Sequence, residues 1–425
     1  MNVELGPPAP AMTKSGRKHP CFPVPQGLPS AGIADPGIDE WRVFECQFPK
    51  AIPIPIPREA AGGSTVNTNP SRHKSHRPVI IRYSIQQHLM QSLNRISFDV
   101  IWQELTRILL SLGFEKSRAK RCAYIFTENT CDGVFSHGLN RFPSFVSDIR
   151  KGIIEVGVVP DLVKSFGAIE QWDGRRGVGP LNAEKAMGRA IELSRAHGLG
   201  CVGLRNTNHW MRGGTYGLQA AGAECIGICW TNTIALMPPW GSSEKKIGNN
   251  PMVVCVPHGE EPVLLDMAMS QFSNGKLEVL RRRGEQLPLA GGYDEKGELT
   301  KDPHAILESF RALPIGYWKG SGLALVLDLL SSLVSGGDST SEISKRQEET
   351  GVSQVFMAID IVSRMGEADS ARKIDEILRD FRDTTPIEET SKVRFPGQGM
   401  IATRRENLSK GIPVDRDLWK EIREL

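Results

Sequence analysis

Residues 198–203 read Gly-Leu-Gly-Cys-Val-Gly, and the segments on either side of them decide the fold. The glycine spacing matches the GxGxxG pattern of Rossmann domains, in which a strand leads into the glycines and a helix follows them. Here the order is reversed. Apolar residues at helical spacing over 186–193 precede the glycines, and a short apolar run at 201–204 follows them. The sequence therefore predicts a helix end and a turn, and no Rossmann domain.

A second glycine pattern lies near the C-terminus, where residues 397–402 read Gly-Gln-Gly-Met-Ile-Ala and fit GxGxxA. Only 23 residues follow it, too few for a βαβ unit. These glycines still allow backbone to approach a ligand closely.

Apolar periodicity predicts an α/β body around these glycines. Helical spacing predicts one helix after a cap at Ser97, ending near Gly113, a second from a cap at Asn182, and a buried one over 323–334 that ends at Gly336. Short apolar runs bounded by turn residues predict buried strands at 201–204, 226–231, 252–256, 263–267 and 355–361.

Charge and proline divide the chain in two. Residues 1–95 hold 11 Lys and Arg against 6 Asp and Glu, and half of the 28 prolines lie before residue 79. We predict that 1–95 is a disordered accessory extension and that 96–425 is the body. A targeting role and a wrongly assigned gene start both stay open for the extension. Acidic residues slightly outnumber basic ones in the body, so nucleic acid is not an expected partner.

Hydropathy and cysteine usage predict a cytoplasmic protein without a membrane partner. No stretch of 18 apolar residues occurs, and the N-terminus lacks the basic-then-apolar plan of a secretory signal. The eight cysteines form no CxxC pair, and Cys225 and Cys229 lie in an apolar run. Free core thiols are the expected state. The basic extension leaves import into an organelle open.

Residues 136–143, Ser-His-Gly-Leu-Asn-Arg-Phe-Pro, bring a hydroxyl, an imidazole and a guanidinium together. His137 can give or take a proton near neutral pH, and Arg141 can bind a carboxylate with two parallel hydrogen bonds. If the stretch begins a helix, these two side chains share one face. The alternative is a helix start capped by Ser136, with both side chains at the surface.

A second polar stretch, residues 206–216, follows the predicted strand 201–204 and leads through two glycines toward a helix. Such strand exits are where α/β proteins place binding sites. His209 is therefore a candidate site residue, and a hydrogen-bonded loop histidine is the equally weighted alternative.

These stretches together resemble the family of malate/L-lactate dehydrogenases that lack a Rossmann domain. The resemblance covers about residues 96–425 and implies an α/β fold with a mixed sheet and surrounding helices. It implies a helical part, about 96–165, packed with 355–425, and a cofactor- and substrate-binding part over 166–354. The motifs that carry it include SHGLNRFPSF, GAIEQWDGRRGVGPLNAEKAM, LRNTNHWMRGGTYG, IGICWTNTIALMPPWG and GYWKGSGLALVLDLL.

The resemblance implies an oxidoreductase that transfers a hydride from a reduced nicotinamide cofactor to a 2-oxo carboxylic acid. NADH is expected, with NADPH as the alternative, and no metal ion is expected. It also implies a homodimer whose active sites lie near the subunit interface. His137 matches the catalytic acid/base, Arg141 the substrate carboxylate contact and His209 a second active-site histidine, with Ser136 and Asn140 beside the substrate. The residues that match cofactor-binding segments are Asn232, Leu264, Leu265, Asp266, Met267, Ala268, Trp318, Lys319, Gly397, Gln398 and Gly399.

Some positions depart from the family pattern. Residues 248–251 read Gly-Asn-Asn-Pro where the family usually has Gly-Thr-Asn-Pro. Threonine and asparagine both have short polar side chains. Gln398 stands where close relatives carry histidine, and an amide cannot be charged, which bears on the cofactor preference. Thr233 lies near a position where ureidoglycolate-type members carry lysine, which argues against that substrate.

Three alternatives accompany this interpretation. The substrate can be malate, lactate or another 2-oxo acid. The chain can be a homologue that binds the cofactor without chemistry, although all the candidate catalytic residues are present. A hydrolase that uses Ser136 with His137 is disfavoured, because adjacent residues rarely present nucleophile and base to each other and no GxSxG motif occurs.

Overall fold

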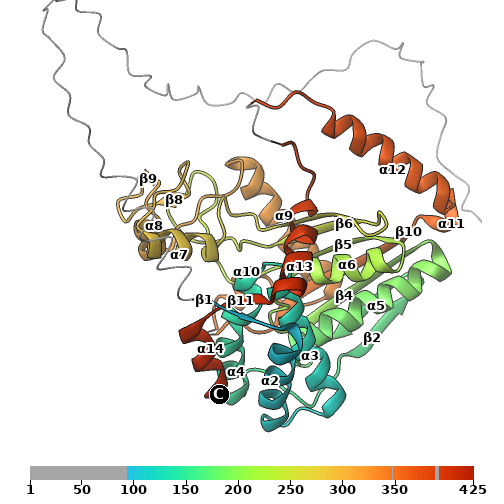
Figure 1. Ribbon diagram of the computed structural model, residues 1–425, viewed down its shortest axis with the longest axis horizontal. Helices are drawn as coiled ribbons and strands as arrows, with labels where there is room; N and C mark the ends of the chain where they lie inside the picture. Colours follow the sequence, from blue (N-terminus) through green and yellow to red (C-terminus); the bar gives the residue numbers. More distant parts are fainter. Residues whose placement is uncertain (1–92, 347, 388–391) are drawn as a thin grey trace, which may run out of the picture. The chain divides into compact units, whose positions relative to one another are not determined.

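The structure is a computed structural model that describes residues 93–346, 348–387 and 392–425 (Figure 1). The predicted extension lies outside the described residues, except for Leu93–Arg95. These residues belong to β1 (Leu93–Ile96), which pairs antiparallel with β11 (Ile412–Asp415) near the C-terminus. The first described strand therefore begins ahead of the predicted boundary, because its pairing partner lies more than 300 residues away and no local pattern shows it.

A mixed seven-stranded sheet forms the centre of the fold, in the order β2-β3-β4-β10-β5-β6-β7. Only β3 and β4 run parallel, and the other neighbouring pairs are antiparallel. The predicted fold class, α/β with a mixed sheet and surrounding helices, is confirmed. The strands are β2 (Asp161–Phe166), β3 (Ile169–Asp173), β4 (Leu199–Thr207), β5 (Cys225–Thr231), β6 (Met252–Val256), β7 (Val263–Met267) and β10 (Val352–Asp360).

Of the seven strands of this sheet, the one that comes last in the sequence lies in the middle. β10 is hydrogen-bonded to β4 on one side and to β5 on the other. Its side chains alternate between the two faces, as the pleat requires: Phe356 joins the core on one face and Val355 the core on the other. The sequence groups residues 355–361 with the C-terminal part that packs on the helical part, whereas the structure builds them into the sheet.

The glycines at 198–203 serve packing. Gly198 ends α5 (Gly179–His197) in the left-handed conformation with a φ of 81°, and β4 begins at the next residue. A Cβ added to Gly200 would lie 2.0 Å from the carbonyl oxygen of Ala190, so helix and strand are in close contact there. The predicted helix end and turn are confirmed.

Two predicted helix starts have different outcomes. Ser97 caps α2 (Phe98–Ser111), as predicted, because its hydroxyl accepts from the backbone N–H of Val100. Asn182 does not cap α5, which begins at Gly179. Its amide instead donates to the Gly174 carbonyl and to Thr207 Oγ1, at 3.0 and 3.1 Å, and ties the helix to β4.

Helices cover both faces of the sheet (Figure 1). α5 and α6 (Gly214–Gly222) share the core that includes Phe356, and α9 (Trp318–Ser335) shares the core that includes Val355. A separate helical layer has its own core, which β11 joins through Ile412 and Val414. The helices of this layer are α2, α3 (Lys116–Cys131), α4 (Phe142–Arg150) and α14 (Arg416–Arg423).

The predicted burial of the helix over 323–334 is wrong. α9 ends at Gly336 as predicted, but Leu325, Leu329 and Leu333 are 51%, 52% and 74% exposed. Only one face of α9 packs on the sheet, through residues that include Ala324. An apolar run predicts that a helix is covered by other apolar residues. In the described chain, such residues cover only one face of α9.

A small lobe is inserted between β7 and α9. It carries β8 (Gly292–Tyr293) and β9 (Leu299–Thr300), and its core consists of Leu277, Leu280, Leu287 and Ile306. The helices of the lobe are α7 (Asn274–Arg283) and α8 (Pro303–Ser309). The remaining helices follow α9 in the sequence: α10 (Thr340–Ile343), α11 (Val362–Met365), α12 (Glu367–Arg382) and α13 (Gln398–Lys410).

Two further sequence expectations concern the membrane and the cysteines. Over the described ranges, no helix has both the length and the apolar character needed to cross a membrane. Cys21 and Cys46 lie outside those ranges. Six cysteines are described, and all are buried free thiols, as predicted: Cys122, Cys131, Cys201, Cys225, Cys229 and Cys255.

Candidate active site

Residues 136–143 do not form one helix. Two single 3₁₀ turns, η1 (Phe135–His137) and η2 (Leu139–Arg141), precede α4. The break falls at Gly138, where a Cβ would lie 2.2 Å from the hydroxyl of Thr130. The same hydroxyl accepts from the backbone N–H of Leu139 at 3.0 Å. Neither predicted alternative holds: the stretch does not start a helix with His137 and Arg141 at consecutive turns, and Ser136 lies inside η1 rather than at a helix cap.

The fold brings His137 and His209 together, although 71 residues separate them in the sequence. Their rings stack with centroids 5.7 Å apart and planes 10° apart. The backbone N–H of Met211 donates to His209 Nδ1 at 3.0 Å. That bond leaves the proton of the neutral ring on Nε2, so His209 presents an N–H donor.

Ser136 Oγ lies 3.1 Å from His137 Nδ1, so these adjacent side chains do interact. The backbone carbonyl of His137 accepts from the Asn129 amide at 3.0 Å, which fixes the turn. Ser136 and Asn140 are exposed, and Arg141 is half-buried. The stretch therefore leaves these polar side chains fully or partly exposed to solvent.

Burial and positive charge keep both imidazoles neutral in the protein without ligand. Burial, followed by the cations of Arg141 and Arg212, lowers the pKa of His137 to about 4. Burial, followed by Arg141, also holds the pKa of His209 well below its ordinary value. His137 can therefore carry a proton near neutral pH only when an anion offsets the nearby cations.

The turn that carries His209 is tightly held. Met211 has a positive φ of 64°, a conformation that costs about 1–3 kcal/mol for such a residue. Asn208 donates through its amide to the carbonyls of Arg176 and Gly177, at 2.7 and 3.0 Å, and accepts from the Thr350 hydroxyl at 2.8 Å. These bonds fix the backbone on either side of the ring.

A buried charge network lies beside the two histidines. Asp132, at the end of α3, accepts from Arg212 at 2.5 Å and from Arg404 of α13 at 2.9 Å. The side chains of Asp132 and Arg212 are almost fully buried. Glu128 also accepts from Arg404. The network joins the exit of β4 to α3 and α13, and no sequence-based prediction names it because its members are 80 and 272 residues apart.

Two carboxyl groups face Arg141, and neither belongs to the predicted site. Burial raises the pKa of Asp148 and of Glu349, and in both the cation of Arg141 opposes that rise. The Glu349 carboxylate also accepts from the backbone N–H of Ile234, just after β5. Glu349 is the functional candidate that the sequence does not reveal, since it follows a polar segment with no recognisable motif.

The predicted cofactor segments meet along β7, the edge strand of the sheet. The N–H of Leu264 donates to the carbonyl of Pro396 at 3.0 Å, which places Gly397 against the start of the strand. Beyond its end, the N–H of Ile315 donates to the Met269 carbonyl at 2.8 Å, which brings Trp318-Lys319 nearby. We call this line of segments, 264–268 with 318–319 and 397–399, the β7 strip.

Two of the predicted cofactor residues have other partners in the chain. The Asn232 amide donates to Asp328 and to the Asp338 carbonyl, and its oxygen accepts from the N–H of Ser353. Asp266 accepts from the backbone N–H of Gly214 at 2.8 Å, at the start of α6. Asn232 is thus fully occupied, whereas Asp266 keeps part of its carboxylate exposed.

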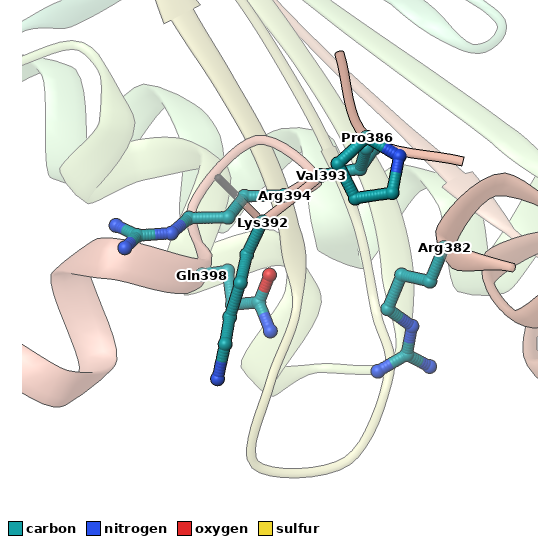
Figure 2. Close-up of a pocket in the computed structure, with 6 residues that line it drawn as sticks. All are labelled: Arg382, Pro386, Lys392, Val393, Arg394 and Gln398. Atoms are coloured by element: carbon teal, nitrogen blue, oxygen red, sulfur yellow. The ribbon is translucent and has the colours of Figure 1, made fainter. Parts of the chain in front are cut away.

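The β7 strip fits a nucleotide cofactor. Gln398 Oε1 is buried and has no hydrogen-bond partner among the described residues, and a cavity of about 300 Å³ opens beside it (Figure 2). A buried amide oxygen without a partner costs about 1–3 kcal/mol, so the position suits a ligand that donates to it.

Comparison with known proteins bears directly on this arrangement. A sequence model of malate/L-lactate dehydrogenases matches residues 96–423. The chain belongs to this malate/L-lactate dehydrogenase family. Membership makes it an oxidoreductase.

Relatives in the malate/L-lactate dehydrogenase family extend the match over their whole length. The chain is 45% identical over 333 residues to a 2,3-diketo-L-gulonate reductase of Citrobacter koseri and 44% identical to one of Escherichia coli. Each match covers 78% of this chain and 100% of the relative. The solved sulfolactate dehydrogenase of Methanocaldococcus jannaschii is 28% identical, with a TM-score of 0.72 over 78% of this chain and 96% of its own.

Proposed function

We propose that this protein reduces the carbonyl group of a 2-oxo carboxylic acid with a hydride from a nicotinamide cofactor. The substrate proposed first is 2,3-diketo-L-gulonate, with 3-dehydro-L-gulonate as the product. The observation that carries the proposal is the stacked pair of His137 and His209 beside Arg141, in a chain 45% identical to a reductase of that name.

Each side chain has a role that its chemistry supports. Arg141 binds the substrate carboxylate with two parallel hydrogen bonds and so orients the adjacent carbonyl. The nicotinamide, when bound along the β7 strip, supplies the hydride. His137 donates the proton that the resulting alkoxide oxygen needs. His209 donates from Nε2 to the same region of the substrate.

Substrate binding and protonation of His137 are coupled in this scheme. The cation of Arg141 helps to keep His137 neutral without substrate. A bound carboxylate offsets that cation and raises the pKa of His137. The proton is therefore taken up with the substrate.

We also propose a homodimer that works in the cytoplasm. Leu325, Leu329 and Leu333 lie one helical turn apart on the exposed face of α9. A contiguous apolar face on the surface is typical of a subunit interface. A second copy of the chain is the occupant that agrees with the expected dimer.

Two other functions remain as alternatives. A malate- or L-lactate-type 2-hydroxy acid dehydrogenase would use the same residues with a smaller substrate. A homologue that binds the cofactor without chemistry would leave the histidine pair unused.

The test follows NADH or NADPH oxidation by the full-length protein at 340 nm, with 2,3-diketo-L-gulonate, oxaloacetate, pyruvate and oxidised ureidoglycolate. Rapid oxidation with diketogulonate alone is expected. Activity only with a smaller 2-oxo acid would keep the mechanism and change the substrate. No activity from a folded protein that binds nucleotide would favour the non-catalytic alternative. Arg141→Lys should mainly raise KM, because lysine cannot form the paired contact.

A further inference from the structure

Arg141 interacts through its charge with two different sets of side chains. Its cation acts on the imidazoles of His137 and His209, and it also acts on the carboxyl groups of Asp148 and Glu349. Neither carboxyl accepts a hydrogen bond from Arg141 in the described part of the chain. The guanidinium therefore keeps its N–H donors for a ligand, although two anions lie near it.

Glu349 is fixed in position by the residues on either side of it. The preceding glutamate pairs with Lys151, directly after α4, at 3.3 Å. The following residue, Thr350, donates to the side-chain oxygen of Asn208 at 2.8 Å, in the turn that carries the second histidine. The Glu349 carboxylate itself accepts from the backbone N–H of Ile234. The segment therefore runs between α4 and the histidine turn, with Glu349 between its two points of attachment.

The two carboxyl groups are suited to a neutral hydrogen-bond donor. Asp148 and Glu349 are each partly exposed, so a ligand can contact them. The cation of Arg141 favours their ionised forms, and an ionised carboxylate only accepts hydrogen bonds. A positively charged group on the ligand would be repelled by the same guanidinium. A hydroxyl donates to a carboxylate without adding charge, so it is the group that satisfies both requirements.

The proposed mechanism leaves one part of the substrate for this contact. Arg141 holds the substrate carboxylate, and the two histidines face the carbonyl oxygen. Only the groups on the carbons beyond the carbonyl remain to interact with Glu349. A hydroxyl there would donate to the Glu349 carboxylate, and a methyl group would leave that carboxylate without a ligand partner.

The same carboxylates disfavour a substrate with a second negative charge. Two anions, Asp148 and Glu349, lie near the single cation of Arg141, and the first substrate carboxylate uses that cation. A second substrate carboxylate would meet like charges without a free cation to offset them. Such repulsion is a common source of specificity, because it weakens the wrong ligand rather than strengthening the right one.

We infer that Glu349 selects the substrate: it accepts a hydrogen bond from a hydroxyl on the carbons beyond the carbonyl and, together with Asp148, excludes 2-oxo acids that carry a second carboxylate. The inference rests on the proposed function, because it requires the substrate carboxylate on Arg141 and the carbonyl beside His137. It favours a hydroxylated monocarboxylic acid as the substrate and opposes the malate-type alternative.

The test compares three small 2-oxo acids that differ in one group. Pyruvate has a methyl group beyond the carbonyl, 3-hydroxypyruvate has a hydroxyl on that carbon, and oxaloacetate has a carboxylate there. The kcat/KM of the full-length protein is measured at 340 nm with NADH and with NADPH. The value for 3-hydroxypyruvate should exceed that for pyruvate at least about tenfold, because a hydrogen bond to a charged group is worth that factor. It should exceed the value for oxaloacetate by at least about tenfold as well.

Two variants separate the hydroxyl contact from the repulsion. Glu349→Gln keeps an acceptor for the N–H of Ile234 but removes the charge. Its kcat/KM should fall about tenfold for 3-hydroxypyruvate and for 2,3-diketo-L-gulonate, rise about tenfold for oxaloacetate and stay within about twofold for pyruvate. Asp148→Asn should raise the value for oxaloacetate and leave the preference for 3-hydroxypyruvate over pyruvate unchanged.

Glu348→Gln is the matched control, since Glu348 is the neighbouring glutamate, is exposed and pairs with Lys151. Its ratios of kcat/KM between the acids should equal those of the unmodified chain. The melting temperature and the nucleotide Kd of all three variants should also be unchanged, which shows that each variant is folded and loaded with cofactor.

Each outcome has a distinct meaning. A preference of the unmodified chain for pyruvate or oxaloacetate over 3-hydroxypyruvate would overturn the inference and leave the proposed function intact. An unchanged kcat/KM of Glu349→Gln for every hydroxylated acid, or equal losses for all the acids, would also overturn it, and equal losses would indicate a purely structural role. A folded protein that binds nucleotide and reduces none of the four acids would overturn the proposed function itself.

Discussion

The two ends of the proposed site are built in opposite ways. At the histidine end, the chain holds its polar groups from within: His209 accepts from Met211, and Asp132 lies between Arg212 and Arg404. At the Gln398 end, a buried amide oxygen has no partner among the described residues. Changes at the first end should therefore affect catalysis or folding, and changes at the second should affect nucleotide binding more than catalysis.

The largest difference between the effect on turnover and the effect on nucleotide binding is expected from His137→Ala. Loss of a general acid lowers turnover by about 10²–10⁴-fold, while the segments of the β7 strip are untouched. Steady-state kinetics combined with nucleotide fluorescence should show a collapsed kcat and an unchanged nucleotide Kd. An equal loss of both would mean that His137 holds the cofactor rather than the reacting oxygen.

The next largest effect is expected from Asp132→Asn. Removing this carboxylate deprives Arg212 and Arg404 of the anion that they share, although Glu128 still pairs with Arg404, so the free energy of unfolding should fall by about 3–5 kcal/mol. Urea denaturation should show a lower midpoint at an unchanged slope.

The matched control for that change is Asp369→Asn, which removes an exposed partner of Arg372 on α12. Its effect should stay below about 1 kcal/mol. Equal destabilisation by the two variants would contradict a special role for the buried network.

A glycine pair sharpens the comparison at the nucleotide end. Gly397 has a φ of 93°, and a Cβ there would lie 3.0 Å from the backbone nitrogen of Leu264. Gly397→Ala should cost about 1–2 kcal/mol and weaken binding of both nucleotides. Gly399→Ala, two residues on, has nothing within 4 Å and should change neither the melting temperature nor the Kd. Similar behaviour of the two variants would argue against close packing of this turn on β7.

The smallest predicted effect is a shift between two pH profiles. In the free enzyme the pKa of His137 is about 4, so reductive kcat/KM should fall as pH rises above that value. In the complex the substrate carboxylate offsets Arg141, so the fall in kcat should come about one pH unit higher. Oxidation of the hydroxy acid needs the neutral imidazole, so its rate should rise over the same range and level off at higher pH. Coincident profiles for kcat and kcat/KM would contradict the coupling.

Sequence patterns predict those parts of the fold whose causes are local. β6 and β7 match the predicted strands residue for residue, because short, mostly apolar runs between turns have few other solutions. The cap at Ser97 and the helix end at Gly198 are local in the same sense.

The remaining features depend on residues far apart in the sequence. The break at Gly138 depends on its contact with Thr130, and the Asn232 side-chain oxygen accepts from the N–H of Ser353. One face of α9 is exposed because no residue of the described chain covers it. Within the site, family motifs point to the histidines and Arg141. Glu349 carries no motif, because only folding brings it near Arg141.

The central position of β10 also constrains how the protein is made. Until residues 352–360 have been synthesised, β4 and β5 each have an open edge where their partner belongs. Open edges with apolar side chains are sites of unwanted pairing between chains. A ribosome that stalls, or a stop codon, shortly before residue 352 would release two incomplete half-sheets rather than a smaller enzyme. The sheet can close only when translation is nearly finished.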